Sequence, residues 1–138
     1  MKNRIAAGIV LYNPDDINRV QQCIESVLEQ IEHVYIFDNS VQPVQLLKTS
    51  QITYVTKANG DEPSCEKVNN VVNSSKVNKN YGIAYALNRI MERAQQDGFD
   101  WVLTMDQDSI LPSGMIPDFR NRINSDSGRT AIFCPQVI

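Results

Sequence analysis

The stretch Trp101-Val102-Leu103-Thr104-Met105-Asp106-Gln107-Asp108-Ser109 decides the expected fold, because a mostly apolar run leads straight into two carboxylates one residue apart. An apolar run of this length, bounded by Gly98 and Pro112, is typical of a strand buried on both faces of a sheet. Asp106 would then lie at the carboxyl end of that strand, where an open parallel sheet has its ligand crevice. Two such carboxylates suit a divalent cation, and a plain acidic turn is the alternative.

Strands and helices are predicted to alternate along the chain. Apolar or β-branched runs predict strands near residues 4–12, 33–38, 52–56, 101–105 and 130–134. Apolar residues at helical spacing predict helices over residues 17–31, 83–94 and 115–123, with a short helix over 44–48. The alternation implies right-handed crossovers and an α/β fold, a three-layer α/β/α sandwich with a mostly parallel sheet.

Two segments carry more specific expectations. Asn13 is expected to cap the first helix, with Pro14 in the first helical position. Residues 57–79 are rich in Asn, Ser and Lys and are too long for an ordinary connection, so a mobile functional loop and an insertion both stay open. We expect this segment to be the most mobile part of the chain, because it offers little apolar surface to offset the entropy of ordering.

Composition excludes several classes of protein. A chain of 138 residues favours one domain, and its net charge of −3 argues against nucleic-acid binding. The three cysteines, Cys23, Cys65 and Cys134, lack metal-type spacing and predict reduced thiols in a cytoplasmic protein. The first residues lack the apolar region of a signal peptide, and no stretch has the length of a transmembrane segment.

Polar residues follow three of the predicted strands, where they would meet at one edge of the sheet. Tyr12 offers a ring face to a nucleotide base, and Asp38 offers acceptors to a base or ribose. Asp106 and Asp108 would hold Mg²⁺ or Mn²⁺ with one or two carboxylates, leaving positions for phosphate oxygens. The cation would act as a Lewis acid on a departing diphosphate. A ring face for the base, hydrogen-bond acceptors for the base or ribose, and a cation for the diphosphate are what a binding site for a nucleotide-diphosphate sugar requires.

Four stretches together resemble the amino-terminal half of a family 2 glycosyltransferase with a GT-A fold, and more particularly the rhamnosyltransferase-type members. These stretches are Gly8-Ile9-Val10-Leu11-Tyr12-Asn13, Val34-Tyr35-Ile36-Phe37-Asp38-Asn39-Ser40, Asn80-Tyr81-Gly82-Ile83-Ala84-Tyr85-Ala86-Leu87-Asn88 and Trp101 through Ser109. Val10 departs from the pattern, because many relatives carry a polar residue there. Residues 57–79 also form a longer segment than is usual before Asn-x-Gly.

The resemblance implies roles for the matching positions. The nucleotide site would comprise Tyr12, Asn13, Asp38, Asn80, Gly82 and Asp106. Asp106 and Asp108 would form the metal- and diphosphate-binding motif, with Asp108 as the preferred direct ligand.

The implied activity is metal-assisted, inverting transfer of a sugar, with rhamnose as the preferred guess. The donor would be dTDP- or UDP-linked, and the acceptor a saccharide or lipid-linked saccharide. Peripheral association with the inner face of the cell membrane would require parts outside this chain. The general base is expected beyond Ile138, so the chain would be a truncated, donor-binding half that is inactive alone. The alternative is a non-catalytic nucleotide-binding or assembly module with a GT-A-like fold.

Overall fold

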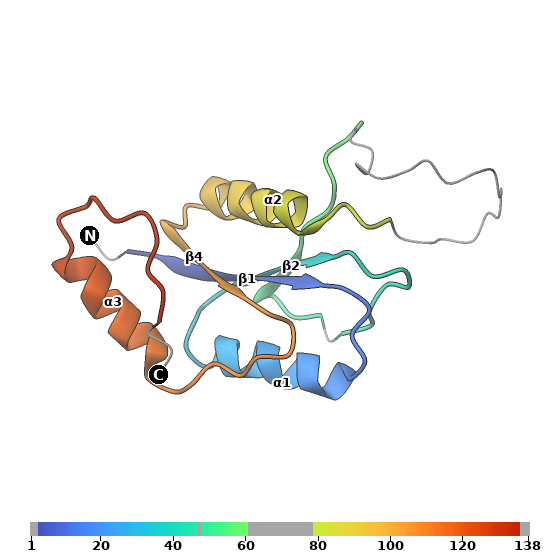
Figure 1. The fold of residues 1–138 in the computed structure, drawn as a ribbon, viewed down its shortest axis with the longest axis horizontal. Helices are drawn as coiled ribbons and strands as arrows, with labels where there is room; N and C mark the ends of the chain where they lie inside the picture. The colour runs from blue at the N-terminus through green and yellow to red at the C-terminus, as the bar shows by residue number, and fades with distance from the viewer. Residues whose placement is uncertain (1–2, 47, 61–78, 136–138) are drawn as a thin grey trace.

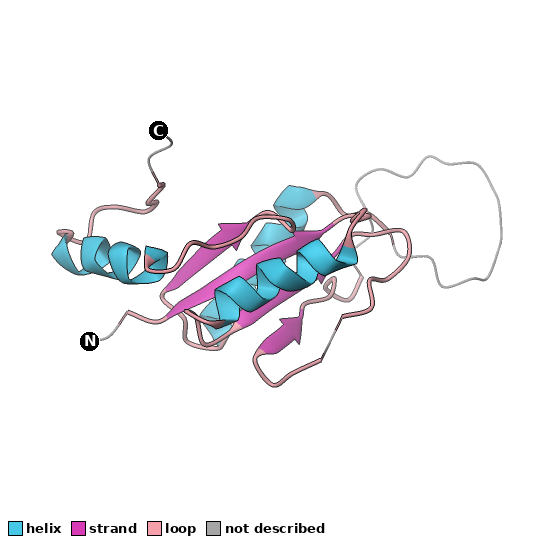
Figure 2. Ribbon diagram, turned by 90° about the horizontal axis from the view of Figure 1, so that it is seen from below, coloured by secondary structure: helices cyan, strands magenta, loops and turns pink. Residues whose placement is uncertain are grey.

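The chain forms a parallel β-sheet flanked by helices (Figures 1 and 2), which confirms the predicted α/β class. The computed structural model describes residues 3–46, 48–60 and 79–135. In these residues the elements are β1 (Ile5–Leu11), α1 (Ile17–Leu28), β2 (Val34–Asp38), β3 (Ile52–Tyr54), α2 (Ile83–Gln96), β4 (Trp101–Met105) and α3 (Met115–Ser125). The sheet order is β3-β2-β1-β4, and every neighbouring pair is parallel.

The core lies on the two faces of the central strands β1 and β2. Figure 1 shows α1 and α2 on opposite sides of the sheet. On the α1 side, Val20, Ile24 and Val27 belong to a cluster that includes alternate residues of β1 and β2. On the α2 side, Ala86 and Ile90 pack in a second cluster. Burial on both faces explains why the sequences of β1 and β2 read as nearly continuous apolar runs.

The connections through α1 and α2 place β2 and β4 on opposite sides of β1, and this arrangement puts a crevice at the end of the sheet. The chain passes from β1 through α1 to β2 on one side, and α2 leads to β4, which pairs with the other side of β1. An open α/β sheet binds its ligands outside the carboxyl ends of the strands at such a switch point. Here the switch point lies between β1 and β4.

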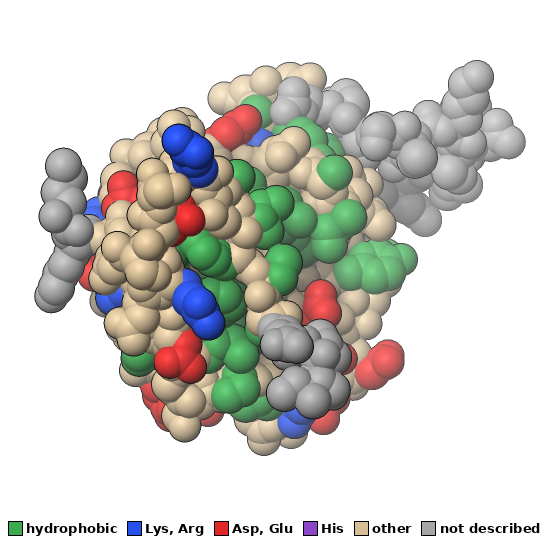
Figure 3. Space-filling model, turned by 60° about the vertical axis from the view of Figure 1, so that its left-hand side comes forward, with side chains coloured by type: hydrophobic (Ala, Val, Ile, Leu, Met, Phe, Trp, Pro, Cys, Tyr) green, Lys and Arg blue, Asp and Glu red, His purple; other side chains and the backbone are tan. Residues whose placement is uncertain are grey.

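The prediction that Trp101–Met105 is buried on both faces of the sheet is wrong. In the described sheet β4 is an edge strand, and its residues are half-buried except for Thr104, which is exposed. Figure 3 shows hydrophobic side chains gathered on this side of the molecule, where Trp101, Leu103 and Phe119 line a hollow of about 450 Å³. An apolar run identifies a strand but contains no information about its neighbours.

The strand predicted near residues 130–134 is also wrong, because this segment is irregular. Phe133 packs its ring 5.4 Å from that of Trp101, measured between centroids, while Ile132 remains 77% exposed. The segment therefore contacts a β4 side chain without pairing with the sheet. Pro135 ends the run and has no N–H to donate to a ladder.

The spacing of apolar residues correctly predicts that the first helix begins at Ile17, but the predicted cap at Asn13 is wrong by three residues. Asp16 caps α1, and its carboxylate accepts hydrogen bonds from the backbone N–H groups of Asn18 and Arg19. Asn13 instead adopts a positive φ of 38° before the helix. The short helix predicted over residues 44–48 is absent from the described residues of that segment. Most of the segment 57–79, with its predicted mobility, lies outside the described residues.

Candidate functional site

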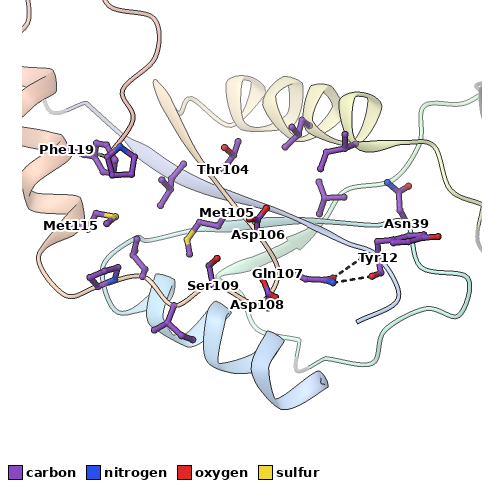
Figure 4. Close-up of a pocket in the computed structure, with 18 of the residues that line it drawn as sticks. Tyr12, Asn39, Thr104, Met105, Asp106, Gln107, Asp108, Ser109, Met115 and Phe119 are labelled. Atoms are coloured by element: carbon purple, nitrogen blue, oxygen red, sulfur yellow. Dashed lines mark hydrogen bonds between the residues drawn. The ribbon is translucent and has the colours of Figure 1, made fainter. Parts of the chain in front are cut away.

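A cleft of about 850 Å³ lies at the carboxyl ends of β1 and β4 (Figure 4). It brings together five of the residues predicted for the site, namely Tyr12, Asn80, Gly82, Asp106 and Asp108. Its walls include the apolar side chains of Met105, Met115 and Phe119. The cleft thus combines an apolar lining with a few polar groups, which is the usual composition of a small-molecule site.

Gln107 ties the segment after β4 to the segment after β1. Its side-chain Oε1 accepts a hydrogen bond from the backbone N–H of Tyr12 at 3.0 Å, and its Nε2 donates to the carbonyl oxygen of Tyr12 at 3.2 Å (Figure 4). The last strand pair of β1 and β4 is Ile9 with Met105. The amide therefore continues the pairing beyond the end of the ladder and holds the two rims of the cleft together.

The main chain of the two aspartates is also held in place. The Cys23 thiol donates to the carbonyl oxygen of Asp106 at 3.4 Å, and the Arg19 Nε donates to that of Asp108 at 2.8 Å. Burial, assisted by the charge of Asp108, raises the pKa of Cys23 to about 11, so this thiol stays protonated at neutral pH. Asp106 and Asp108 consequently project from an anchored backbone.

The carboxylates themselves remain available. Both aspartates are exposed, and among the described residues neither carboxylate makes a hydrogen bond or an ion pair. In the same part of the chain no group of three or more His, Cys, Asp or Glu residues could enclose a metal ion. The pair therefore fits an open cation site, in which a ligand and water would supply the remaining oxygens that Mg²⁺ requires.

Asp38 lies outside the lining of this cleft. Its two carboxylate oxygens accept the backbone N–H groups of Ser40 and Val44, at 2.9 and 2.8 Å. In β2, Ile36 belongs to the core on the α1 side and Phe37 to the core on the α2 side. Successive residues of a strand alternate between faces, so the pleat directs Asp38 away from α2. Its carboxylate borders a separate hollow of about 620 Å³.

Asn39, which the sequence analysis did not include among the site residues, occupies the position expected of Asp38. It is buried, lines the cleft and holds the segment before α2. Its Nδ2 donates to the carbonyl oxygen of Gly82 at 3.2 Å, and its Oδ1 accepts from the N–H of Tyr81 at 3.0 Å. The polar residue directly after β2 was the only signal in the sequence. Asn39 thereby positions the opposite rim of the cleft.

Asn80 and Gly82 form that rim. The Oδ1 of Asn80 accepts the Gly82 N–H at 2.8 Å. Gly82 has φ of 84°, which favours glycine, and it precedes α2 without a side-chain cap. Among the described residues, the cap position of α2 therefore makes no side-chain hydrogen bond, and an anion would be favourable at this helix start.

Tyr12 and Asn13 have different surroundings. The Tyr12 side chain is 53% exposed and lines the cleft, so a ring face is accessible to a ligand. Asn13 is used within the loops, because its N–H donates to the Ser40 Oγ and its Oδ1 accepts from the Val41 N–H, both at 2.9 Å. The structure does not bring Asn13 into the cleft lining.

Comparison of the chain with models of known families, with curated protein sequences and with solved structures gave no match. Among the described residues, no helix has the length and apolar character needed to cross a membrane.

Proposed function

We propose that this chain is the donor-binding part of a glycosyltransferase related to family 2, with a GT-A type of architecture. The observation that carries the proposal is the pair of unpartnered carboxylates, Asp106 and Asp108, on an anchored backbone at the switch-point cleft. A nucleotide-diphosphate sugar, dTDP- or UDP-linked, is the proposed ligand. Rhamnose is the preferred sugar, with a saccharide or lipid-linked saccharide as acceptor and inversion at the anomeric carbon.

The diphosphate is assigned to the rim between β4 and α2. Asp106 and Asp108 would hold Mg²⁺ or Mn²⁺ through one or two carboxylates, and phosphate oxygens would complete the coordination. When bound, this cation supplies Lewis-acid stabilisation of the charge on the departing diphosphate. The start of α2 after Gly82, which has no side-chain cap among the described residues, would add N–H donors for the same anion.

The base is assigned to the ring face of Tyr12 beside Val10. Val10 offers no hydrogen bond, so recognition of the base there rests on stacking and shape. A nucleotide contact at Asp38 requires a ligand that reaches past the end of β2, because this carboxylate borders a different hollow. Asp38 therefore contributes less to the proposal than Tyr12 does.

One observation favours the alternative of a nucleotide-binding module without turnover. Among the described residues that line the cleft, the only carboxylates are Asp106 and Asp108, and no histidine is present. Both are assigned to the donor, and a carboxylate that binds a cation is a poor base because the cation stabilises its ionised form. Transfer needs a base within reach of the acceptor hydroxyl, and the described part of the cleft offers none.

The proposal is tested by calorimetric titration of the chain with TDP, UDP and TMP, with and without MnCl₂. We expect the diphosphates to bind more tightly with Mn²⁺ and the monophosphate to gain little, because it lacks the second phosphate. Asp108→Asn should lower the Mn²⁺-dependent affinity for the better diphosphate by on the order of tenfold to a hundredfold, as loss of groups around a bound metal commonly does.

Glu29→Gln is the matched control, because it also removes one negative charge from an exposed side chain. Glu29 lies at the end of α1, ten positions after Arg19 and therefore about 15 Å further along the helix axis. The control should bind as the unaltered protein does. If Asp108→Asn binds TDP and Mn²⁺ as the control does, the metal assignment is wrong.

A further inference from the structure

One face of α1 and of the turn after it carries four side chains that form hydrogen bonds outside the helix. Arg19, Cys23, Ser26 and Gln30 follow one another at intervals of four, three and four residues, so they lie in one row. All four make hydrogen bonds to the main chain between residues 106 and 116. We call these four residues the α1 row.

Ser26 and Gln30, the C-terminal half of the α1 row, hold the segment between β4 and α3 in place. The Ser26 Oγ accepts the N–H of Leu111 at 2.9 Å. The Gln30 side chain donates to the carbonyl oxygen of Pro112 at 2.9 Å and accepts from the N–H of Ile116 at 3.3 Å. This segment has no regular structure before α3, so side chains supply the partners that a ladder would otherwise provide.

Arg19 and Cys23, the N-terminal half of the α1 row, form hydrogen bonds with the main chain of the two aspartates. Cys23 bonds the carbonyl oxygen of Asp106, and Arg19 bonds that of Asp108. Arg19 lies in the first turn of α1, where the Asp16 cap accepts its backbone N–H at 3.2 Å. The guanidinium therefore extends from a fixed backbone. A charge-assisted bond from arginine is also stronger than one between neutral groups.

We propose that Arg19 is a positioning residue for Asp108, and that the α1 row sets the geometry of the carboxylate pair. The functional consequence rests on the proposed nucleotide and metal binding. Arg19 does not line the cleft, so it acts through the Asp108 backbone and not by contact with the ligand. With its backbone held, Asp108 keeps its carboxylate at the spacing from Asp106 that a shared cation needs.

The test compares Arg19→Gln and Arg19→Lys with Arg122→Gln. Arg122 is exposed on α3 and does not line the cleft, so the control removes the same charge without altering the cleft lining. The first readout is amide hydrogen exchange without ligand. Arg19→Gln should accelerate exchange at Ser109, whose N–H bonds the carbonyl oxygen of Asp106 in the same turn. Ser26→Ala should accelerate exchange at Leu111.

The second readout is calorimetry with TDP. Arg19→Gln should lower the Mn²⁺-dependent affinity by about threefold to tenfold, the range for a charge-assisted bond at an exposed site. Affinity for TDP without metal should stay unchanged, which a general loss of structure would not allow. Arg19→Lys keeps the charge and one donor, so it should recover part of the loss. The control should resemble the unaltered protein in both readouts.

The two proposals fail in different ways. If the unaltered protein shows no Mn²⁺-dependent binding of TDP, the proposed function is wrong, and the exchange data still decide whether Arg19 orders the segment. If exchange at Ser109 is the same in Arg19→Gln and in the control, the positioning role is wrong. Equal losses of TDP affinity with and without Mn²⁺ would also overturn it.

Discussion

Replacing Gly8 by alanine should destabilise the chain through steric contact, chiefly with Ile90. Gly8 lies in the middle of β1, and a Cβ there would be 2.8 Å from the Cγ2 of Ile90 and 3.3 Å from the Cγ1 of Val102. Ile90 is fully buried, so its side chain or α2 must move by roughly 0.6 Å to restore ordinary contact at 3.4 Å.

The expected loss of stability is small enough to leave the chain folded, so that its free energy of unfolding can be measured. Overpacking of this kind costs about 1–3 kcal/mol, and alanine recovers roughly 0.5–1 kcal/mol of the conformational entropy that glycine loses in a strand. The two ranges leave a net loss of about 0–2.5 kcal/mol, so the free energy of unfolding should fall by roughly 1 kcal/mol. Urea unfolding followed by far-UV circular dichroism measures it. Because α2 begins at the cleft, a shift of this helix should also weaken nucleotide binding.

A double-mutant cycle with Ile90→Ala identifies the cause. Ile90→Ala alone leaves a cavity and should cost about 2–5 kcal/mol. In the double variant the new methyl group enters that cavity. The stability lost by the double variant should therefore be about 1–2 kcal/mol smaller than the sum of the losses of the two single variants. An unchanged or increased stability of Gly8→Ala would refute the reasoning. Strictly additive losses would refute the assignment to Ile90.

Two further predictions concern titratable groups. Burial lowers the pKa of His33, whose Nε2 lies 2.7 Å from the Thr53 Oγ1, so the unfolded chain binds a proton more readily than the folded one. The free energy of unfolding should thus decrease as the pH falls from 6.5 through the lowered pKa; a His33→Gln variant whose urea midpoints keep the same slope there would contradict this. In a Cys65→Ser variant, the exposed Cys134 should react with a thiol reagent at once, while the buried Cys23, with its raised pKa, should react only on unfolding. The absorbance of the released reagent group measures both rates. Equal rates for the two thiols would show that Cys23 is accessible in the folded chain.

The sequence predicts the central part of this fold well and its edge poorly. β1 and β2 are buried on both faces, so their apolar runs correspond directly to their surroundings. β4 has a similar run but lies at the edge of the sheet. The position of a strand in a sheet depends on how the whole chain folds and not only on the sequence of that strand. Asn13 and Asp16 are both acceptable caps, and tertiary contacts of the Asn13 side chain decided between them.

The candidate site shows the same division between local and distant information. Asp106 and Asp108 could be recognised because only one residue separates them in the sequence and both follow a strand. The residues that hold this segment in place could not be recognised from the sequence. Gln107 forms a hydrogen bond with Tyr12, 95 positions away, and Arg19 forms one with Asp108, 89 positions away. Asp38 was assigned to the cleft from its place at the end of β2, whereas the alternation of the strand brings Asn39 there instead.

The order of strands also has a consequence for how the chain folds. β1 pairs with β2 through a crossover that links Ala7 to Val34, but its pairing with β4 joins Ile5 to Trp101. Closing the second connection costs about 1 kcal/mol more in chain entropy, and contacts at such separation form slowly. The unit β1-α1-β2 is therefore the natural nucleus, with β4 arriving last. Tyr12 and Asp106 thus meet only when folding is nearly complete, so a partly folded chain would have a sheet but no cleft.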